Sequence, residues 1–422
     1  MKLKILLVNT QHYHGGGNST DCLNTATLLR AQGHEVAFFA MASNKNLVDP
    51  NADLFVSHVD FQELNRCWSL PNSLKVLARV IYSREARQKF TRLLERFRPN
   101  LVHLHNIHDH LSPSIIFAAQ QQGVPVIWRL HDYKSICPNS HYLIDETGEI
   151  CEACSRGRFF PAVLRRCKKG SLLASSMAAL EAYVHDFLEI QRHIAAYLAP
   201  SRFLQGKYLN QGYPPDKFRY TPYFLPDEMF QVNGHDEGYF LFLGKVDPIK
   251  GIFTLLEAAR RLPRVPFLIA GDVREPLASE LPGLLPTNVR FLGLRNREEV
   301  RQLLAGARAL VFPSIWYENQ PFSILEAFAG GKPVIASDLG GMTELVEHEV
   351  RGLLAPAGNA EALSEAMQLL WAKPEVAREM GRQGREYARE SHSSRRHYHD
   401  LEEIYLQVLS KGKLISPAKL EV

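Results

Sequence analysis

The feature that most constrains the fold is an alternation of short apolar runs with helical stretches, which pauses once near the middle of the chain. Before the pause, the apolar runs have the length of buried β-strands: Lys4–Val8, Val36–Phe39, Leu54–Val56, Leu101–Leu104, Val124–Leu130 and Ala196–Ala199. Helical patterns lie between them. Strands that alternate with helices predict a parallel sheet with helices on its faces.

The pause at Tyr220–Gly238 is rich in proline, asparagine and glycine, as is typical of a linker. The alternation then restarts with runs at Tyr239–Leu243, Phe267–Ala270, Val289–Leu292, Ala309–Phe312, Pro333–Ser337 and Gly352–Ala355. We therefore predict two doubly wound, Rossmann-like α/β domains, at residues 1–225 and 236–393, each large enough to bury a core. The helical pattern in residues 394–422 is predicted to return to the first domain. A ligand cleft is expected between the carboxyl ends of the two sheets.

Composition limits the class of protein. Apolar residues make up 45% of the chain and charged residues 22%, which is typical of a globular protein. No uncharged apolar run reaches the roughly 18 residues of a transmembrane helix. The apolar run at the N-terminus is too short for a signal peptide and is followed by polar residues and glycines, so we predict a cytoplasmic protein.

The charge is unevenly spread, although the formal net charge is only +4. Two strongly basic runs, Arg66–Arg98 and Arg156–Lys169, lie in the first half of the chain. They are either solvated helix faces or surfaces that attract anionic lipid head groups or an anionic acceptor. The second interpretation predicts a peripheral position at the inner face of a membrane. No nucleic-acid partner is expected.

The strongest local signal is the stretch from Pro313 to Pro333, in which a buried strand ends, a polar turn follows and a new helix begins. Pro321 suits the first helical position and Gly330 the helix end. The free amides of such a helix start can hold a phosphate. Glu318 lies in the turn, and Glu326 lies in the helix among apolar neighbours, where a carboxylate without a partner is costly. The alternative is that both are solvated.

A second signal follows the strand at Tyr239–Leu243. Gly244 ends this strand, and Lys245 and Lys250 come before the next helix. Lysines at such a loop can neutralise a diphosphate as it leaves. Taken alone they are surface lysines, but beside the first signal we interpret them as ligand-binding.

Two weaker signals lie in the first domain. Gly15 and Gly16 follow the first strand and would let the backbone approach a ligand, or they only form a loop. They do not make the G-x-G-x-x-G fingerprint of dinucleotide sites. His131 ends a strand and can orient a substrate hydroxyl, with Asp132 holding its ring, or it is a structural histidine.

At these residues the chain resembles the GT4 family of retaining glycosyltransferases, which have the GT-B fold. The resemblance runs from Lys4 to about Leu409, and its most specific part is the E-x7-E element formed by Glu318 and Glu326. It implies the transfer of a hexose-type sugar from a nucleotide-diphosphate sugar. The basic first domain favours a glycan or a lipid-linked oligosaccharide as the acceptor, in polysaccharide biosynthesis.

The resemblance also implies a role for each site residue. Glu318 lies by the donor sugar, and Glu326 holds the nucleotide ribose. Lys245 and Lys250 bind the diphosphate, although the family usually has arginine at the first position. The remaining implied contacts are the acceptor-side His131 and the donor-side Gly15, Gly16, Gly244 and backbone amides of Phe322 and Ser323. The implied chemistry needs no metal, because the diphosphate leaves toward the lysines while the acceptor attacks from the same face.

Four of the six cysteines fall within 31 residues, in an insert at residues 137–170: Cys137, Cys151, Cys154 and Cys167. One C-x2-C pair and two further thiols suit a structural, tetrahedral zinc ion. An iron–sulfur cluster is an alternative, and a disulfide is disfavoured in a reducing cytoplasm. Some bacterial GT4 members that build surface polysaccharide have a similar insert. The histidines at 103, 105, 108 and 110 are interpreted as ordinary packing.

Other classes of protein remain open. The main alternative is a non-catalytic protein of the same fold that binds a nucleotide sugar or a carbohydrate, and the complete set of two glutamates and two lysines argues against it. An epimerase or a phosphorylase of the same two-domain shape is another. A dinucleotide oxidoreductase is disfavoured by the missing glycine fingerprint.

Overall fold

The computed structural model describes residues 1–58, 79–108, 110–230 and 235–413. The part of the basic run Arg66–Arg98 that precedes residue 79 lies outside these residues. The chain divides into two compact units. The first unit comprises Met1–Pro200, Gln205–Thr221 and Tyr398–Val422, and the second comprises Ser201–Leu204 and Pro222–His397. The boundary at Thr221 and Pro222 falls within the stretch that the sequence predicts as a linker.

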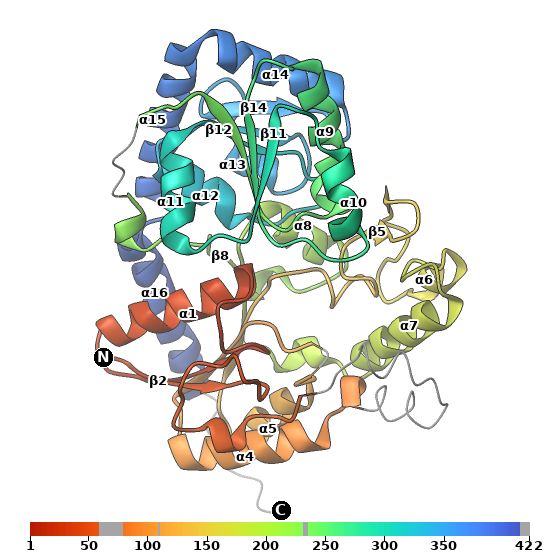
Figure 1. The fold of residues 1–422 in the computed structure, drawn as a ribbon. Coiled ribbons are helices and arrows are strands. Elements are labelled where there is room, and N and C mark those ends of the chain that lie inside the picture. The colour runs from red at the N-terminus through yellow and green to blue at the C-terminus, as the bar shows by residue number, and fades with distance from the viewer. Residues whose placement is uncertain (59–78, 109, 231–234, 414–422) are drawn as a thin grey trace, which may run out of the picture. The chain divides into compact units, whose positions relative to one another are not determined.

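The first unit is built on a sheet of six parallel strands in the order β2-β1-β3-β4-β7-β8 (Figure 1). The strands are β1 Lys4–Val8, β2 Glu35–Phe39, β3 Leu101–Leu104, β4 Val126–Arg129, β7 Ala196–Ala199 and β8 Phe218–Tyr220. Its helices are α1 Gly17–Ala31, α4 Arg84–Phe97, α5 Ser114–Gln121, α6 Phe160–Leu164, α7 Leu172–Phe187 and most of α8 Arg202–Asn210. The continuous apolar runs become strands because both faces of this sheet are buried.

One predicted strand of the first unit is wrong. Leu54 ends a short 3-10 helix, η1 (Ala52–Leu54), and Val56 forms only an isolated bridge with Met41. The carboxylate of Asp49 accepts a hydrogen bond of 2.8 Å from the amide of Asn51, which turns the chain just before this run. Three apolar residues are too few to outweigh that turn.

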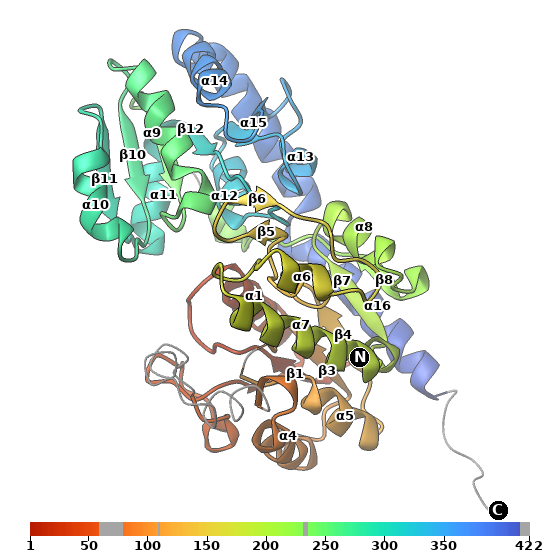
Figure 2. The ribbon, with the colours of Figure 1, turned by 90° about the vertical axis from the view of Figure 1, so that its right-hand side faces the viewer.

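The second unit has the same architecture, with a parallel sheet in the order β11-β10-β9-β12-β13-β14 (Figure 2). Its strands are β9 Tyr239–Leu243, β10 Phe267–Ala270, β11 Val289–Gly293, β12 Ala307–Phe312, β13 Val334–Ser337 and β14 Gly352–Ala355. Its helices are α9 Ile252–Arg261, α10 Leu277–Leu284, α11 Arg297–Gly306, α12 Phe322–Ala329, α13 Met342–Leu345, α14 Ala360–Ala372 and α15 Pro374–Ser391. Two buried apolar clusters contain the strands' side chains and the helices that cover them.

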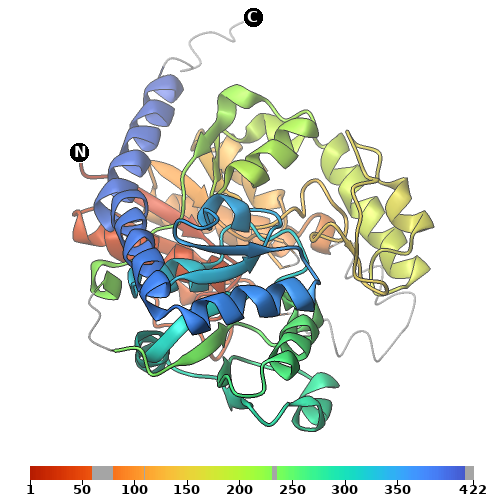
Figure 3. The ribbon, with the colours of Figure 1, turned by 90° about the horizontal axis from the view of Figure 1, so that it is seen from above.

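The last helix, α16 (Ser394–Lys413), packs on the first unit from Tyr398 onward (Figure 3). Its buried side chains join the cluster that contains strands β1 and β3: Leu401, Ile404, Tyr405 and Val408. The hydroxyl of Tyr405 also lies 2.8 Å from Nδ1 of His103. The apolar spacing of this segment therefore produces the helix that the sequence predicts.

Both sheets reverse their strand order at one point. The reversal falls between β1 and β3 in the first unit and between β9 and β12 in the second. In open parallel sheets, the loops that leave the carboxyl ends of such neighbouring strands diverge to opposite faces and leave room for a ligand.

None of the helices in the described parts of the chain has the length and apolarity needed to span a membrane.

Candidate functional site

In the second unit, the loops after β9 and β12 are held against each other. The carbonyl oxygen of Ile249 accepts hydrogen bonds from the amide of Ile315, at 3.0 Å, and from the hydroxyl of Ser314, at 3.2 Å. Gly251 has a φ of +75°, and a Cβ atom there would lie 1.8 Å from the carbonyl oxygen of Pro313. Only glycine fits at this position. This close approach brings Lys250 from one loop to Glu318 from the other.

Lys250 and Glu318 form the centre of the site. Nζ of Lys250 lies 2.5 Å from Oε1 of Glu318. The same oxygen accepts hydrogen bonds from Oγ of Ser314, at 2.9 Å, and from Nε1 of Trp316, at 2.7 Å. The Glu318 side chain is 8% exposed and that of Lys250 22% exposed. Three donors therefore fix one carboxylate oxygen and leave an ammonium group partly open to solvent.

The backbone at Glu318 also packs on a pair of glycines that the sequence analysis did not single out. The amide of Gly341 donates to the carbonyl oxygen of Glu318 at 2.7 Å. A Cβ atom on Gly341 would lie 1.8 Å from the carbonyl oxygen of Asn319, and Gly340 has a φ of +63°. The signal was a glycine pair that begins three residues after the strand at Pro333–Ser337, where a ligand loop is expected.

Helix α12 begins beside this turn. Pro321 caps the helix instead of occupying its first position, and Gly330 ends it as predicted. Pro321 has an extended conformation, while its carbonyl oxygen already accepts from the amide of Ile324 at 3.2 Å. The amides of Phe322 and Ser323 thus precede the first donor bonded within the helix, which is the position where a helix start holds an anion.

Glu326 lies one turn further along α12 and is half-buried. Burial raises the pKa of its carboxyl group to about 7, although the guanidinium group of Arg297 opposes the shift. Lys245 is 42% exposed and pairs with Asp247 at 2.6 Å. The structure thus brings Lys250 and Glu318 into contact. The charged groups that act on Lys245 and Glu326 are Asp247 and Arg297, respectively.

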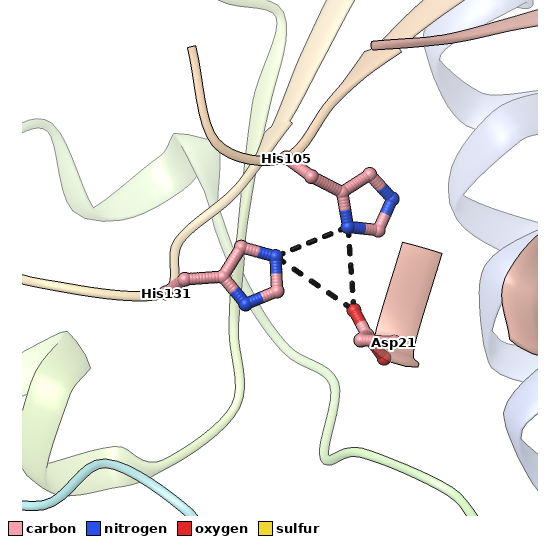
Figure 4. Close-up of side chains that lie close together, drawn as sticks. All are labelled: Asp21, His105 and His131. Atoms are coloured by element: carbon pink, nitrogen blue, oxygen red, sulfur yellow. Dashed lines mark hydrogen bonds and ion pairs between the residues drawn. The ribbon is translucent and has the colours of Figure 1, made fainter. Parts of the chain in front are cut away.

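In the first unit, His131 belongs to a buried triad with His105 and Asp21 (Figure 4). Nε2 of His131 lies 3.0 Å from Nδ1 of His105, which in turn lies 3.4 Å from Oδ2 of Asp21. Asp21 Oδ2 and His131 Nε2 are 3.9 Å apart. His105 follows β3, His131 follows β4, and Asp21 lies in α1, so all three elements converge at the carboxyl edge of the sheet.

Arg129 sets the charge of this triad. Its Nε lies 3.1 Å from Oδ2 of Asp21, and its Nη1 donates to the carbonyl oxygen of Thr221 at 2.5 Å. Burial alone would raise the pKa of Asp21, but Arg129 and the two imidazoles hold it far below its ordinary value. Burial lowers the pKa of both His105 and His131, and Arg129 lowers them further. The triad therefore consists of one carboxylate and two neutral imidazoles.

The predicted partner of His131 has different contacts. Oδ1 of Asp132 accepts from the amide of Lys134 at 2.9 Å and lies 3.9 Å from Nε2 of His108. The sequence alone predicts no role for Asp21 and ordinary packing for His105. The available signal was that His105 and His131 directly follow neighbouring strands, which places both at the ligand edge of the sheet.

The glycines of the first loop precede α1. Gly15 packs closely on Tyr13, because a Cβ atom on Gly15 would lie 2.7 Å from Cε2 of that ring. Gly16 caps α1, and its carbonyl oxygen accepts from the amide of Thr20 at 2.9 Å. Both glycines lie in the loop between β1 and α1, at the strand-order reversal of the first unit.

The four cysteines of the insert lie around one buried region. Cys151, Cys154 and Cys167 belong to a single apolar cluster with Phe159 and Ala162. Burial raises the pKa of Cys154 to about 12 and that of Cys167 to about 11, and neighbouring thiols add to both shifts.

The fit of these thiols to a metal ion is incomplete. Within the described part of the chain, Asp21, His105 and His131 are the one group of three or more candidate ligands whose atoms all lie within 4.8 Å of one another. The cysteine sulfurs are gathered, but more loosely than the ligands of a bound zinc ion, which would draw them together.

Two known protein families match the chain one after the other. Residues 16–223 match the family described as glycosyl transferase 4-like domain, and residues 227–387 match the family described as glycosyl transferases group 1. The two matched stretches follow each other along the chain in the order of the two units of the structure.

Solved structures share this fold. Sucrose-phosphate synthase from Thermosynechococcus elongatus superposes with a TM-score of 0.70 at 19% identity, over 97% of this chain and 100% of that chain. HepE of Anabaena, in complex with UDP and glucose, gives 0.64 at 17% identity, over 96% and 100%. At these identities the likeness establishes the fold, which is GT-B with two Rossmann-like domains.

Several curated relatives are named as sugar transferases. The amylovoran biosynthesis glycosyltransferase AmsK of Erwinia amylovora is 29% identical over 44% of this chain, the D-rhamnosyltransferase WbpZ of Pseudomonas aeruginosa 35% over 34%, and the O-antigen chain mannosyltransferase C of Escherichia coli 33% over 35%. The matches cover 49%, 39% and 41% of those relatives' own lengths, respectively.

Proposed function

We propose that the protein is a retaining glycosyltransferase that moves a hexose-type sugar from a nucleotide-diphosphate sugar to a glycan or lipid-linked oligosaccharide in polysaccharide biosynthesis. The observation that carries the proposal is the contact of Lys250 with Glu318 beside the start of α12. An ammonium group, a fixed carboxylate and the free amides of a helix start are suited to a sugar diphosphate. The relatives named in polysaccharide biosynthesis support the reaction class.

In the proposed reaction, the bond between the sugar's anomeric carbon and the diphosphate breaks, and a new bond forms from the acceptor oxygen to the same carbon. The diphosphate takes the electron pair of the broken bond. Lys250, Lys245 and the amides of Phe322 and Ser323 stabilise its charge. The acceptor attacks from the side on which the diphosphate leaves, so a phosphate oxygen takes the acceptor's proton and the configuration is retained.

The two glutamates have separate proposed roles. The Glu318 carboxylate, fixed by three donors at one oxygen, faces the donor sugar and favours the positive charge that develops on its ring. Glu326 accepts hydrogen bonds from the ribose hydroxyls. No metal enters this scheme, because protein cations and backbone amides balance the diphosphate charge.

A panel of nucleotide sugars tests the proposal. A donor that binds the folded chain raises its melting temperature, by mass action. The same donor should release nucleoside diphosphate when a glycan acceptor is added, and the product anomer gives the stereochemistry. Lys250→Ala should abolish the donor-dependent shift, while Lys373→Ala, an exposed lysine on the same unit, should keep it. A panel of uridine, guanosine, thymidine and cytidine diphosphate sugars that leaves melting unchanged and releases no diphosphate would refute the proposal. Binding without turnover would favour the non-catalytic alternative.

A further inference from the structure

Helices α6 and α7 expose large apolar side chains at an unusual density. Among the described residues, seven of the fourteen exposed large apolar side chains lie between residues 160 and 187. We call them the α6–α7 surface: Phe160, Leu164, Leu172, Leu173, Leu180, Tyr183 and Phe187. Phe187 is 84% exposed and Leu164 75%. Single exposed apolar residues are ordinary, but a group of this size marks an interaction site.

The orientation of α7 is the reverse of that of an ordinary surface helix. Leu173, Leu180 and Phe187 recur every seven residues and therefore share one face, which is exposed. The buried residues of the helix are mostly small, as at Ala178 and Ala179. The protein thus packs against the small residues of α7 and leaves its largest apolar side chains in solvent, which costs free energy unless a partner covers them.

The two helices form one structural unit. The hydroxyl of Tyr183 in α7 accepts hydrogen bonds from the amides of Phe159 and Phe160, at 3.0 Å each, where α6 begins. The helices lie side by side in two perpendicular views (Figures 1 and 2). On its inner side, α7 is anchored by Glu181, which is buried and lies 2.7 Å from Nζ of Lys134. The apolar residues are therefore presented on a fixed scaffold.

Exposed positive charge adjoins the apolar residues. Arg165, Arg166 and Lys169 lie in the connection between α6 and α7, and all three are exposed. In the described part of the chain, none of these three takes part in an ion pair within 4.0 Å. Arg156 and Arg158, also exposed, precede α6, and no acidic residue occurs from Arg156 to Lys169. Exposed carboxylates border the two ends of this run, because Asp186 of α7 lies against Gly157 and Glu146 lies against Gly170. Arg165 and Arg166 lie between these ends.

We propose that the α6–α7 surface docks on an anionic lipid bilayer. Its leucines and aromatic rings enter the boundary between head groups and acyl chains, and the arginines and lysine bind lipid phosphate groups. A second copy of the chain fits less well, because a two-fold contact would bring the same basic connection against itself. The inference rests on exposure and charge within the first unit, and it stands apart from the proposed reaction.

Flotation with lipid vesicles tests the inference on the full chain without any donor or acceptor. Vesicles of phosphatidylcholine alone are compared with vesicles that also contain phosphatidylglycerol. We expect binding to the phosphatidylglycerol vesicles that weakens as salt rises toward about 0.15 M but does not vanish, because the apolar contribution is not screened.

Two variants separate the apolar and the charged contributions. Leu180→Ser/Phe187→Ser should weaken partitioning about tenfold or more. Arg165→Glu/Arg166→Glu should weaken it at least about fivefold per charge and abolish the preference for phosphatidylglycerol. The matched controls, Leu294→Ser and Arg264→Glu/Arg378→Glu, change exposed residues of the second unit and should bind as the wild type does. Circular dichroism checks that every variant is folded.

Three results would overturn the inference: wild-type protein that stays with the unbound fraction at low salt, α6–α7 variants that float as well as the wild type, or a Leu180→Ser/Phe187→Ser variant that only converts a dimer to a monomer. The experiment with nucleotide sugars tests the second unit, so the absence of donor binding would leave the vesicle result unaffected. Equally, absent vesicle binding leaves the proposed reaction standing.

Discussion

Lys250 and Glu318 depend on each other because the carboxylate is almost fully buried. Lys250→Met leaves this carboxylate with the two neutral donors of Ser314 and Trp316. We expect the substitution to lower the free energy of unfolding by about 1–3 kcal/mol. Adding Glu318→Gln should recover part of the loss, because the uncompensated charge is removed. Urea denaturation of the single and double variants measures both effects.

Two comparisons make this prediction specific. Lys245→Met removes an exposed lysine that is paired with Asp247, so it should change stability by no more than about 0.5 kcal/mol. Transfer activity should fall in Lys250→Met and should not return in the double variant, since the diphosphate still lacks its cation. A Lys250→Met variant as stable as the wild type would contradict the coupling.

Glu326 makes the second unit sensitive to pH. Its ordinary pKa is 4.5 and burial raises it to about 7, so between these values the folded state binds more protons than the unfolded state. The contribution of Glu326 to the free energy of unfolding therefore falls as pH rises from about 4.5 to 7. As pH rises from about 5 to about 8, the free energy of unfolding of Glu326→Gln should increase relative to that of the wild type by up to about 3 kcal/mol. A stability difference that stays constant with pH in denaturation experiments would contradict it.

Asp21 should support catalysis without touching the donor site of the second unit. Asp21→Asn removes the charge that balances Arg129 and loosens His105, which lies 3.0 Å from His131. We expect donor-dependent melting to remain while the transfer rate falls about 10²-fold, as for a displaced residue that orients the acceptor hydroxyl. Initial rates at varied acceptor concentration separate kcat from KM. Asp132→Asn is the control, and a larger loss there would make Asp132 the residue that orients His131.

At the residue scale, the sequence predicts the groups that carry chemistry better than it predicts their partners. Glu318 and Lys250 are recognisable because each follows an apolar strand in a loop of unusual composition. Asp21 is not, because it lies within α1 and meets His105 and His131 only in the folded chain. The placement of Asp21 beside Arg129 depends on tertiary contacts that no local spacing encodes.

At the element scale, strand positions are predictable because buried parallel strands are continuous apolar runs. Leu101–Leu104, Ala196–Ala199 and Phe267–Ala270 have the predicted bounds. Loop geometry is less predictable. Gly251 and Gly341 are required because each meets a neighbouring carbonyl oxygen, and these neighbours are distant in sequence. A glycine's role in such a contact is visible only once the loops are placed.

The cysteine insert gives a prediction for a whole element. We propose that Cys137, Cys151, Cys154 and Cys167 hold one structural zinc ion, which would draw their loosely gathered sulfurs together and convert the buried neutral thiols into thiolates. Metal analysis of purified protein should find about one zinc per chain. Cys154→Ser should lose the metal and melt at a lower temperature, whereas Cys22→Ala, at a buried cysteine in α1, should retain it. Protein that contains no zinc and still melts at the temperature of the zinc-containing wild type would contradict the proposal.

At the scale of the whole molecule, the sequence predicts two α/β domains because the strand–helix alternation stops and restarts around a linker. It does not predict that a short segment within the sequence range of one unit belongs to the other unit. Ser201–Leu204 belongs to the second unit, where Glu344 accepts hydrogen bonds from the amides of Arg202 and Phe203. A helix start and a glutamate are common features, and nothing in their spacing marks them as partners.

The division of the chain into two units predicts where a donor acts. Ligand binding slows hydrogen exchange most strongly where amides and side chains contact the ligand. With a bound nucleotide sugar, we expect slower exchange in residues 244–251 and 313–323 of the second unit. Exchange in residues 160–187 of the first unit should stay unchanged, and anionic vesicles should produce the opposite pattern. Slower exchange at residues 160–187 with donor alone would assign the nucleotide to the first unit and contradict the role given to Lys250 and Glu318.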